Sequence, residues 1–288
     1  MAVQVRSRIS AFTVLKVLFL LAAVVATLYP LLYMLSISIS DTTQVLLGKV
    51  GLIPKGVNLS MYRFVLRDQR IFTSYRNTIF YVLVGTALSL VVTAAAAFSL
   101  SKRRVVFHRF FTILVVVTMF FGGGMIPTYL TIRGLGMIDT IWAVLLPSAV
   151  STYNLLVMRT FFDGFPKEIE ESGQLDGLND VGILTRLVLP SSQAVLASIG
   201  LFYAVSRWNA YFDPFLYLNT PDLFPLQIIL RDILQAGQTN VVGGGDTLMV
   251  EESLRYTAVI VSILPIIVVY PFLQKYFVKG VMLGAVKG

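Results

Sequence analysis

Long apolar segments limit the folds open to this chain more than any other feature. A bilayer core about 30 Å thick is crossed by about 20 apolar residues in a helix. Six segments meet this length, at approximately 14–37, 78–100, 110–130, 138–161, 184–205 and 256–277. Only 13% of the residues are charged, against about 25% in soluble proteins. The sequence therefore predicts an all-α integral membrane protein with six transmembrane helices, in one domain over residues 1–288.

Basic residues at the ends of these segments predict the orientation. Cytoplasmic flanks of membrane helices are enriched in Lys and Arg. Placing both termini, the turn 101–109 and the loop 163–183 on one side gathers Arg6, Arg8, Lys102, Arg103, Arg104, Arg109, Lys167, Lys275, Lys279 and Lys287 there. We expect that side to be cytoplasmic, with loops 41–76 and 207–255 outside. The first apolar run is too long for the core of a signal peptide, so we interpret it as a retained span.

Several function classes are disfavoured by what the sequence lacks. With no cysteine, disulfides and thiolate metal sites have no residues to use, and a single histidine, His108, removes most metal and Ser-His chemistry. No GxxxxGK[ST] phosphate loop occurs, because the only Gly-Lys pair, Gly48-Lys49, is followed by valine. The net charge of +8 is dispersed along the chain, which fits membrane topology better than binding to nucleic acid. We predict no enzymatic activity and no metal site.

An acidic segment interrupts the apolar pattern. It holds Asp163, Glu168, Glu170, Glu171, Asp176 and Asp180, six of the fifteen acidic residues. Gly177 suits a turn between two short helices, and Pro190 marks a break in the following apolar segment. On charge alone, the segment could be a solvated loop between two spans.

The spacing within this segment resembles a known motif. Glu171-Ser172-Gly173, then Asp176-Gly177, then Leu189-Pro190 resembles the EAA loop of ABC importer membrane subunits, whose usual form is Glu-Ala-Ala, Asp-Gly-Ala and a distant Leu-Pro. Ser172 and Gly173 keep small residues where helices meet closely, whereas Leu178 departs from the pattern. The C-terminal Gly-Ala-Val-Lys-Gly also resembles the carbohydrate-uptake type, particularly its oligosaccharide and polysaccharide group, and the similarity runs from the first span to the last residue.

The resemblance implies a complete transport machine. This chain would have the fold of a type I importer permease and lie in a bacterial inner membrane. It would pair with a second, homologous permease, with two ATPase subunits that bind ATP and Mg, and with an external solute-binding protein. ATP-driven closure of the ATPases would move the loop from Glu171 to Gly177 and open the cavity outward. The externally docked binding protein would then release its oligosaccharide or polysaccharide, which alternating access would carry to the cytoplasm. The residues implied in ATPase coupling are Glu170, Glu171, Ser172, Gly173, Asp176, Gly177 and Leu178.

Residues that contact the solute are less sharply indicated. Rings, hydroxyls and an amide within or just after the apolar segments could line a sugar path or pack between subunits, namely those of Tyr129, Tyr153, Asn154, Tyr203 and Trp208. The long loop 207–255 suits docking of the binding protein, with Tyr211, Gly243, Gly244 and Asp246 as candidates. For Gly122–Gly124 we favour close helix packing slightly over a bend that lines a water-filled path.

Two alternatives remain open at this stage. An ion-coupled secondary transporter would need carboxylates within the membrane or an inverted repeat with broken helices. The six segments contain one acidic residue, Asp139, at the edge of the fourth, where it can cap a helix. The second alternative is an ABC permease for a solute that is not a sugar. The basic net charge also leaves an acidic saccharide conceivable beside a neutral one.

Overall fold

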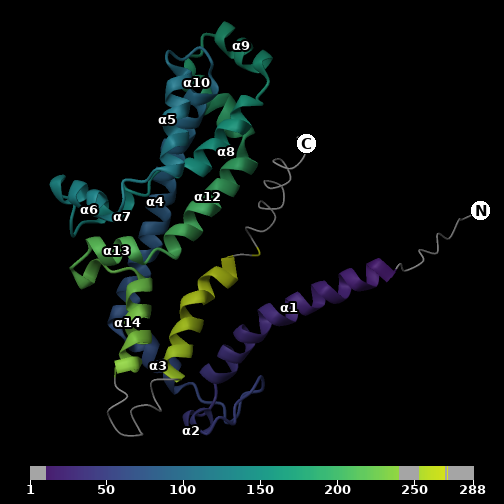
Figure 1. Ribbon diagram of the computed structural model, residues 1–288, viewed down its shortest axis with the longest axis vertical. Coiled ribbons are helices and arrows are strands. Elements are labelled where there is room, and N and C mark those ends of the chain that lie inside the picture. The colour runs from purple at the N-terminus through teal and green to yellow at the C-terminus, as the bar shows by residue number, and fades with distance from the viewer. Residues whose placement is uncertain (1–10, 240–252, 270, 272–288) are drawn as a thin grey trace, which may run out of the picture. The chain divides into compact units, whose positions relative to one another are not determined.

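The structure, a computed structural model, describes residues 11–239, 253–269 and 271 (Figure 1). Its contacts divide the chain into two units, residues 1–68 with 232–264 and residues 69–231 with 265–288. Every regular element in the described ranges is a helix, in agreement with the predicted all-α class.

The first unit begins with the long apolar helix α1, Ala11–Ser38, followed by α2, Thr42–Leu46, and α3, Ser60–Arg67. Helix α1 matches the first predicted span, and the side chains of its apolar window are all exposed. A small core forms around Ile37, with Tyr33 and Tyr256 packed against it. The hydroxyl groups of Ser38 and Tyr62 lie 2.7 Å apart, which ties α3 to the end of α1.

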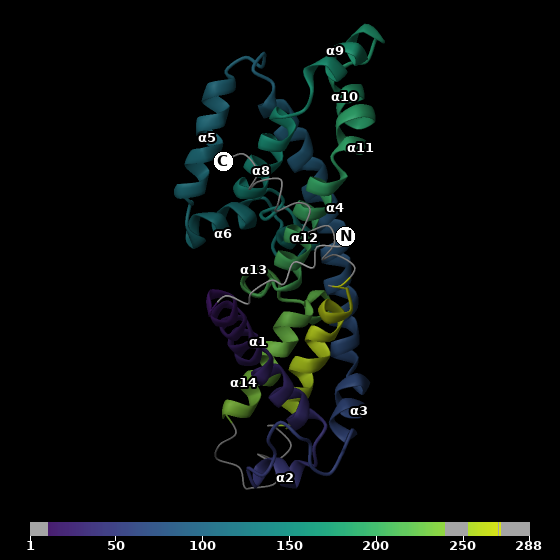
Figure 2. The ribbon, with the colours of Figure 1, turned by 90° about the vertical axis from the view of Figure 1, so that its right-hand side faces the viewer.

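The second unit contains most of the helices (Figure 2). In chain order they are α4 Gln69–Ser101, α5 His108–Phe120, α6 Met125–Gly134, α7 Ile141–Leu145, α8 Thr152–Asp163, α9 Lys167–Leu175, α10 Asp180–Ile183, a π-helical turn η1 Leu184–Val188, α11 Leu189–Ser191, α12 Gln193–Trp208, α13 Phe212–Tyr217 and a 3-10 turn η2 Pro221–Leu223. Helix α14, Leu226–Thr239, begins in this unit and ends in the first.

The core of the second unit lies where α4 packs against α8 and α12. Ala97, Met158 and Ile199, one from each helix, are completely buried. The buried face of α4 is rich in small residues, including Gly85 and Ser89. Such residues let membrane helices approach closely, so α4 is the central element of this unit.

Three of the six predicted spans are interrupted. The chain bends by 116° between α5 and α6, and by 87° between the segment Asp180–Ser191 and α12. The prediction of one helix over 110–130 is therefore wrong, because the chain leaves the helix at Phe121 and Gly124 has a φ of +82°. Likewise, the 184–205 segment bends at Ser192.

The predicted segment 138–161 is also divided. Helix α7 ends at Leu145 and α8 begins at Thr152. Pro147 lies in the gap, where its missing N–H cannot continue a helix. Asp139 lies before α7 with a φ of +60°, so it forms a turn instead of capping the predicted helix.

Two described helices, α1 and α4, are long and apolar enough to cross a membrane, and the count rises to four if each bent pair forms one span. In the last predicted segment, Ser253–Val269 is a shorter apolar helix. No described atom lies within 4 Å of a side chain built at Gly122 or Gly123. The close packing favoured for these glycines is thus absent from the described part of the chain, and the segment forms the bend between α5 and α6.

Candidate coupling site

The acidic segment folds as two short helices joined by a turn, as predicted. Helix α9 begins after Pro166, and Glu168 and Glu170 lie in its first turn, where acidic side chains favour the positive end of the helix dipole. Gly177 has a φ of +83°, a conformation that glycine adopts without strain. The Asn179 side chain then caps α10 by accepting from the backbone N–H of Gly182 at 2.8 Å.

A close approach at Gly173 holds α9 against the following helix. A Cβ atom at this buried position would lie 2.7 Å from Cδ1 of Leu187 and 3.4 Å from Cδ1 of Leu178. Leu178 also reaches the space beside Gly182. The predicted need for a small residue at position 173 is met, and the leucine that departs from the motif fills the space between the two helices.

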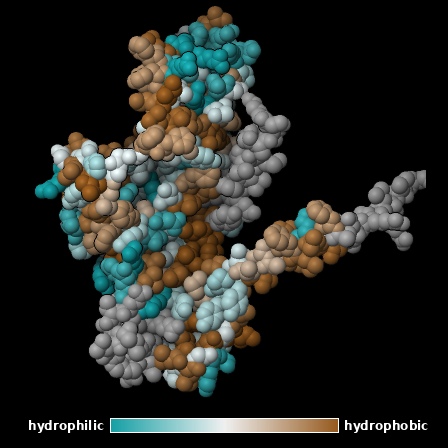
Figure 3. Space-filling view, viewed as in Figure 1, coloured by the Kyte–Doolittle hydropathy of each residue, from teal (hydrophilic) through white to brown (hydrophobic). Residues whose placement is uncertain are grey.

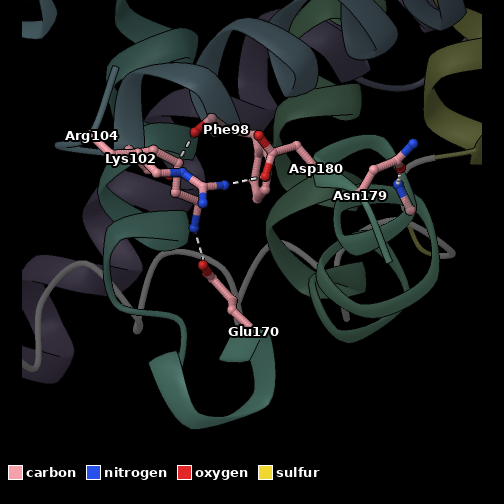
Figure 4. Close-up of polar contacts among 8 residues, drawn as sticks. Phe98, Lys102, Arg104, Glu170, Asn179 and Asp180 are labelled. Atoms are coloured by element: carbon pink, nitrogen blue, oxygen red, sulfur yellow. Dashed lines mark hydrogen bonds and ion pairs between the residues drawn. The ribbon is translucent and has the colours of Figure 1, made fainter. Parts of the chain in front are cut away.

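Two ion pairs join this segment to the turn between α4 and α5 (Figure 4). Lys102 pairs with Glu170 on α9, and Arg104 pairs with Asp180 at the start of α10. The side chains of the first pair are only 14% exposed, and Nζ of Lys102 also lies 4.5 Å from the ring centre of Phe98. The second pair is 54% and 63% exposed, so water screens it strongly. Of the two, Lys102–Glu170 is therefore the firmer attachment.

The remaining side chains of α9 face outward. Among the predicted coupling residues, Glu171, Ser172, Asp176 and Gly177 are exposed. Leu175, at the end of α9, is 90% exposed and was not among the predicted residues. With Ile169 and Val181, exposed at 44% and 67%, it gives this polar segment three exposed apolar side chains, and exposed apolar surface is a candidate contact for another protein. Figure 3 shows hydrophilic residues gathered at the end of the second unit where Figure 1 draws α9.

A polar hollow of about 530 Å³ lies between α9 and the α4–α5 turn. Its charged lining includes Lys102, Arg103 and Arg104 from the turn, and Lys167 and Glu171 from α9. Within the described ranges, no group of three His, Cys, Asp or Glu side chains could hold a metal ion. The site offers charges of both signs and three exposed apolar side chains, Ile169, Leu175 and Val181, which suits docking of a protein.

The predicted solute-path residues do not form one site. Tyr129 stacks on Tyr217 with ring centres 6.3 Å apart, Tyr153 is exposed, and Asn154 is buried. Trp208 is 9% exposed.

Tyr203 is also buried, and its hydroxyl group lies 2.7 Å from Oγ1 of Thr93 and accepts from the backbone N–H of Ser151 at 2.9 Å. Tyr203 and Tyr211 both line a separate pocket of about 430 Å³. Gly243, Gly244 and Asp246, proposed for docking, lie outside the described residues.

Known proteins resemble this chain over almost its whole length. The chain is 37% identical to the polygalacturonan/rhamnogalacturonan transport system permease protein YtcP of Bacillus subtilis (strain 168), covering 94% of this chain and 96% of that protein. It is also 37% identical to the protein LplC of the same organism, over 96% and 95% of the two chains. No family model matches.

The fold agrees with a solved transporter. One chain of the crystal structure of a bacterial ABC transporter involved in the import of the acidic polysaccharide alginate superposes with a TM-score of 0.86 at 33% identity, covering 96% of this chain and all of that one. These likenesses define a permease subunit embedded in a membrane. The chain belongs to the family of ABC importer permeases.

Membership in this family decides two questions that the residues left open. The predicted permease subunit is confirmed, and ATP hydrolysis belongs to separate ATPase subunits of such transporters. A third relative is the arabinooligosaccharides transport system permease protein AraQ of Halalkalibacterium halodurans, which is 26% identical over 90% of this chain. None of these relatives supports the alternative of an ion-coupled secondary transporter. The chain is accordingly a protein of the inner membrane.

Proposed function

We propose that this chain forms half of the translocation path of an importer that moves an oligosaccharide or polysaccharide into the cytoplasm. The observation that carries the proposal is the 37% identity, over 94% of the chain, to a permease named for polygalacturonan and rhamnogalacturonan transport. A second, homologous permease supplies the other half. Two ATPase subunits bind ATP and Mg below the membrane, and an external binding protein delivers the solute.

The topology that fits this role has six crossings, with both termini in the cytoplasm and a single permease domain over residues 1–288. Helices α1 and α4 supply two crossings, and the bent pair α5–α6 is a third. The interrupted segment α7–α8, the bent segment from α10 to α12, and the helix from Ser253 complete the set. Irregular backbone at membrane depth is tolerated where it lines a cavity or packs in protein, which suits the inner surface of a transporter.

Coupling to the ATPases occurs through the outward face of α9. Glu171, Ser172, Asp176 and Gly177 are exposed there, and Leu175 supplies the apolar contact. Gly173 and the Lys102–Glu170 pair fix the opposite face of α9 to η1 and to the α4–α5 turn. A movement of the ATPases is therefore passed to the core helices α4, α8 and α12 during alternating access.

On the external side we place the solute path at the pocket that Tyr203 and Tyr211 line. The binding protein docks on the loop 207–255, where its candidate contacts are Tyr211, Gly243, Gly244 and Asp246. Tyr129, Tyr153, Asn154 and Trp208 lie apart from this pocket's lining, so we give them packing roles within or between subunits.

The test of coupling uses Leu175→Ser in the complete transporter, expressed with its partners and purified in detergent. We expect less copurified ATPase subunit and a loss of the ATPase stimulation that solute-loaded binding protein produces, because the apolar contact is removed. Leu135→Ser is the matched control, since Leu135 is also exposed, at 67%, and follows α6. If both variants behave as the wild type, α9 does not dock through Leu175. If no ATPase copurifies with the wild type, the importer assignment itself fails.

A further inference from the structure

Arg207, in the last turn of α12, is a buried cation held only by neutral groups. It is 7% exposed. Its Nη2 donates to Oγ of Ser89 at 2.8 Å and to the carbonyl oxygens of Leu145 and Ser148 at 3.4 and 3.3 Å. Its Nη1 donates to Oγ of Ser148 at 3.3 Å. Among the described residues, no carboxylate forms an ion pair with it.

The space around this guanidinium group is shaped to receive it. A Cβ atom at Gly85 would lie 2.5 Å from Nε of Arg207, so only glycine at that position leaves room. Ser89, one helical turn further along α4, is completely buried. Nε is enclosed without a hydrogen-bond partner in the described structure. A charge buried without a counter-charge destabilises a protein, and a charged side chain in a membrane segment indicates a functional site.

Arg207 lies on the wall of a pocket of about 430 Å³, within the range of about 300–1,000 Å³ typical of small-ligand sites. Tyr81, Tyr211 and Phe212 supply aromatic rings to its lining, and Asn209 supplies an amide. Asp213 also lines the pocket, but it forms no ion pair with Arg207 within the described ranges. The pocket therefore presents a cation and a carboxyl group that form no direct ion pair within the described residues.

A sugar unit that bears a carboxylate group fits this combination. Its hydroxyl groups can donate to the Asp213 carboxylate and accept from the Asn209 amide, and its apolar ring face can pack on an aromatic ring. Among the described residues, Nη1 of Arg207 has one acceptor, Oγ of Ser148, so its other N–H can bind an anionic oxygen. A neutral sugar would satisfy the first contacts and leave the charge of Arg207 uncompensated.

We propose that this pocket is a subsite for an acidic sugar unit, with Arg207 giving the preference for a carboxylate. The inference rests on the proposed role in saccharide import and names the class of saccharide. The related transporter that imports the acidic polysaccharide alginate is consistent with it, but the uncompensated cation beside a ligand-sized pocket carries the argument.

The first test measures the charge of the pocket without any sugar. Because the chain has no cysteine, Ser206→Cys places a single thiol in this chain, on the exposed lining beside Arg207. In the assembled transporter we expect an anionic methanethiosulfonate reagent to modify this thiol faster than a cationic one, relative to their rates with a free thiol. Adding Arg207→Gln should lower the ratio of the two rates about tenfold, because a unit charge at close range is removed.

Arg133→Gln is the matched control for that variant. Arg133 is an exposed arginine of α6 that does not line the pocket, so the ratio should stay at the wild-type value. A ratio that Arg207→Gln leaves unchanged, in a transporter that still copurifies with its partners, would overturn the proposal. Arg207→Lys keeps the charge and should retain most of the ratio, which separates a lost charge from a disturbed fold.

The second test uses ligand protection of the same thiol. We expect trigalacturonate to slow the labelling of Ser206→Cys at a lower concentration than its carboxyl-reduced, neutral counterpart, and the difference to disappear with Arg207→Gln. Equal protection by the two saccharides, or protection by neither, would overturn the acidic subsite. A wrong importer assignment would give a different result, because solute-loaded binding protein would then fail to stimulate ATP hydrolysis by the purified transporter.

Discussion

Removing the ion pair between Lys102 and Glu170 tests how α9 is attached to the membrane helices. The perturbation is a double-mutant cycle that combines Lys102→Ala and Glu170→Ala in the assembled transporter. Both side chains are 14% exposed, and Lys102 also contacts the ring of Phe98. Either single variant leaves a largely buried charge without its partner, whereas the double variant removes both charges.

The expected coupling energy follows from this burial. Hydrogen bonds to charged groups contribute about 1.5–3 kcal/mol, so we expect a coupling energy in that range for Lys102–Glu170. The parallel cycle with Arg104→Ala and Asp180→Ala should give about 0–1 kcal/mol, because that pair is more than half exposed and water screens it. The exposed pair thus serves as the matched control.

The assay is unfolding of the purified transporter in mixed detergent micelles with increasing denaturing detergent, together with the solute transported per ATP hydrolysed. Each single Lys102 or Glu170 variant should lower that transport ratio, since α9 then moves without carrying α4 with it. Equal coupling energies for the two pairs would refute the reasoning from burial. An unchanged transport ratio would refute the role of the pair in transmission.

Two further predictions concern hydrogen bonds within the second unit. Tyr203→Phe should destabilise the protein by about 1–3 kcal/mol, because it removes the hydroxyl group that accepts from the backbone N–H of Ser151. Solute affinity should stay unchanged, because the variant keeps the ring of Tyr203 in the pocket lining; a stable variant with weakened affinity would contradict this structural role of the hydroxyl group. Hydrogen bonds from the Thr220 side chain and the backbone lower the pKa of Asp139, a group in the turn outside the apolar helices. The stabilisation that ionised Asp139 provides is therefore present above the ordinary aspartate pKa and is lost as the pH falls through the lowered pKa. The midpoint temperature of thermal unfolding, measured from pH 7 to pH 3, should therefore show a step that Asp139→Asn removes and that Asp163→Asn retains.

Local chemistry explains which features of this protein could be predicted from the sequence alone. The length rule for membrane helices identified α1 and α4 because burial in lipid requires about 20 apolar residues, whatever the rest of the chain does. The turn at Gly177 and the small residue at Gly173 followed from backbone freedom and close approach, which depend on the nearest residues. The spacing of the acidic segment likewise indicated the family, because the resemblance depends on residue types in a fixed order along the chain.

The bends and the long-range contacts were decided only by the tertiary structure. Glycines at 122–124 are compatible with packing or with a bend, and the fold selects the bend between α5 and α6. Lys102 looked like a topology signal, yet its partner Glu170 is 68 positions away in the chain. Arg207 is held by Ser89, 118 positions away. Composition and spacing determine which segments enter the membrane, whereas the partner of a charge depends on which helices pack together.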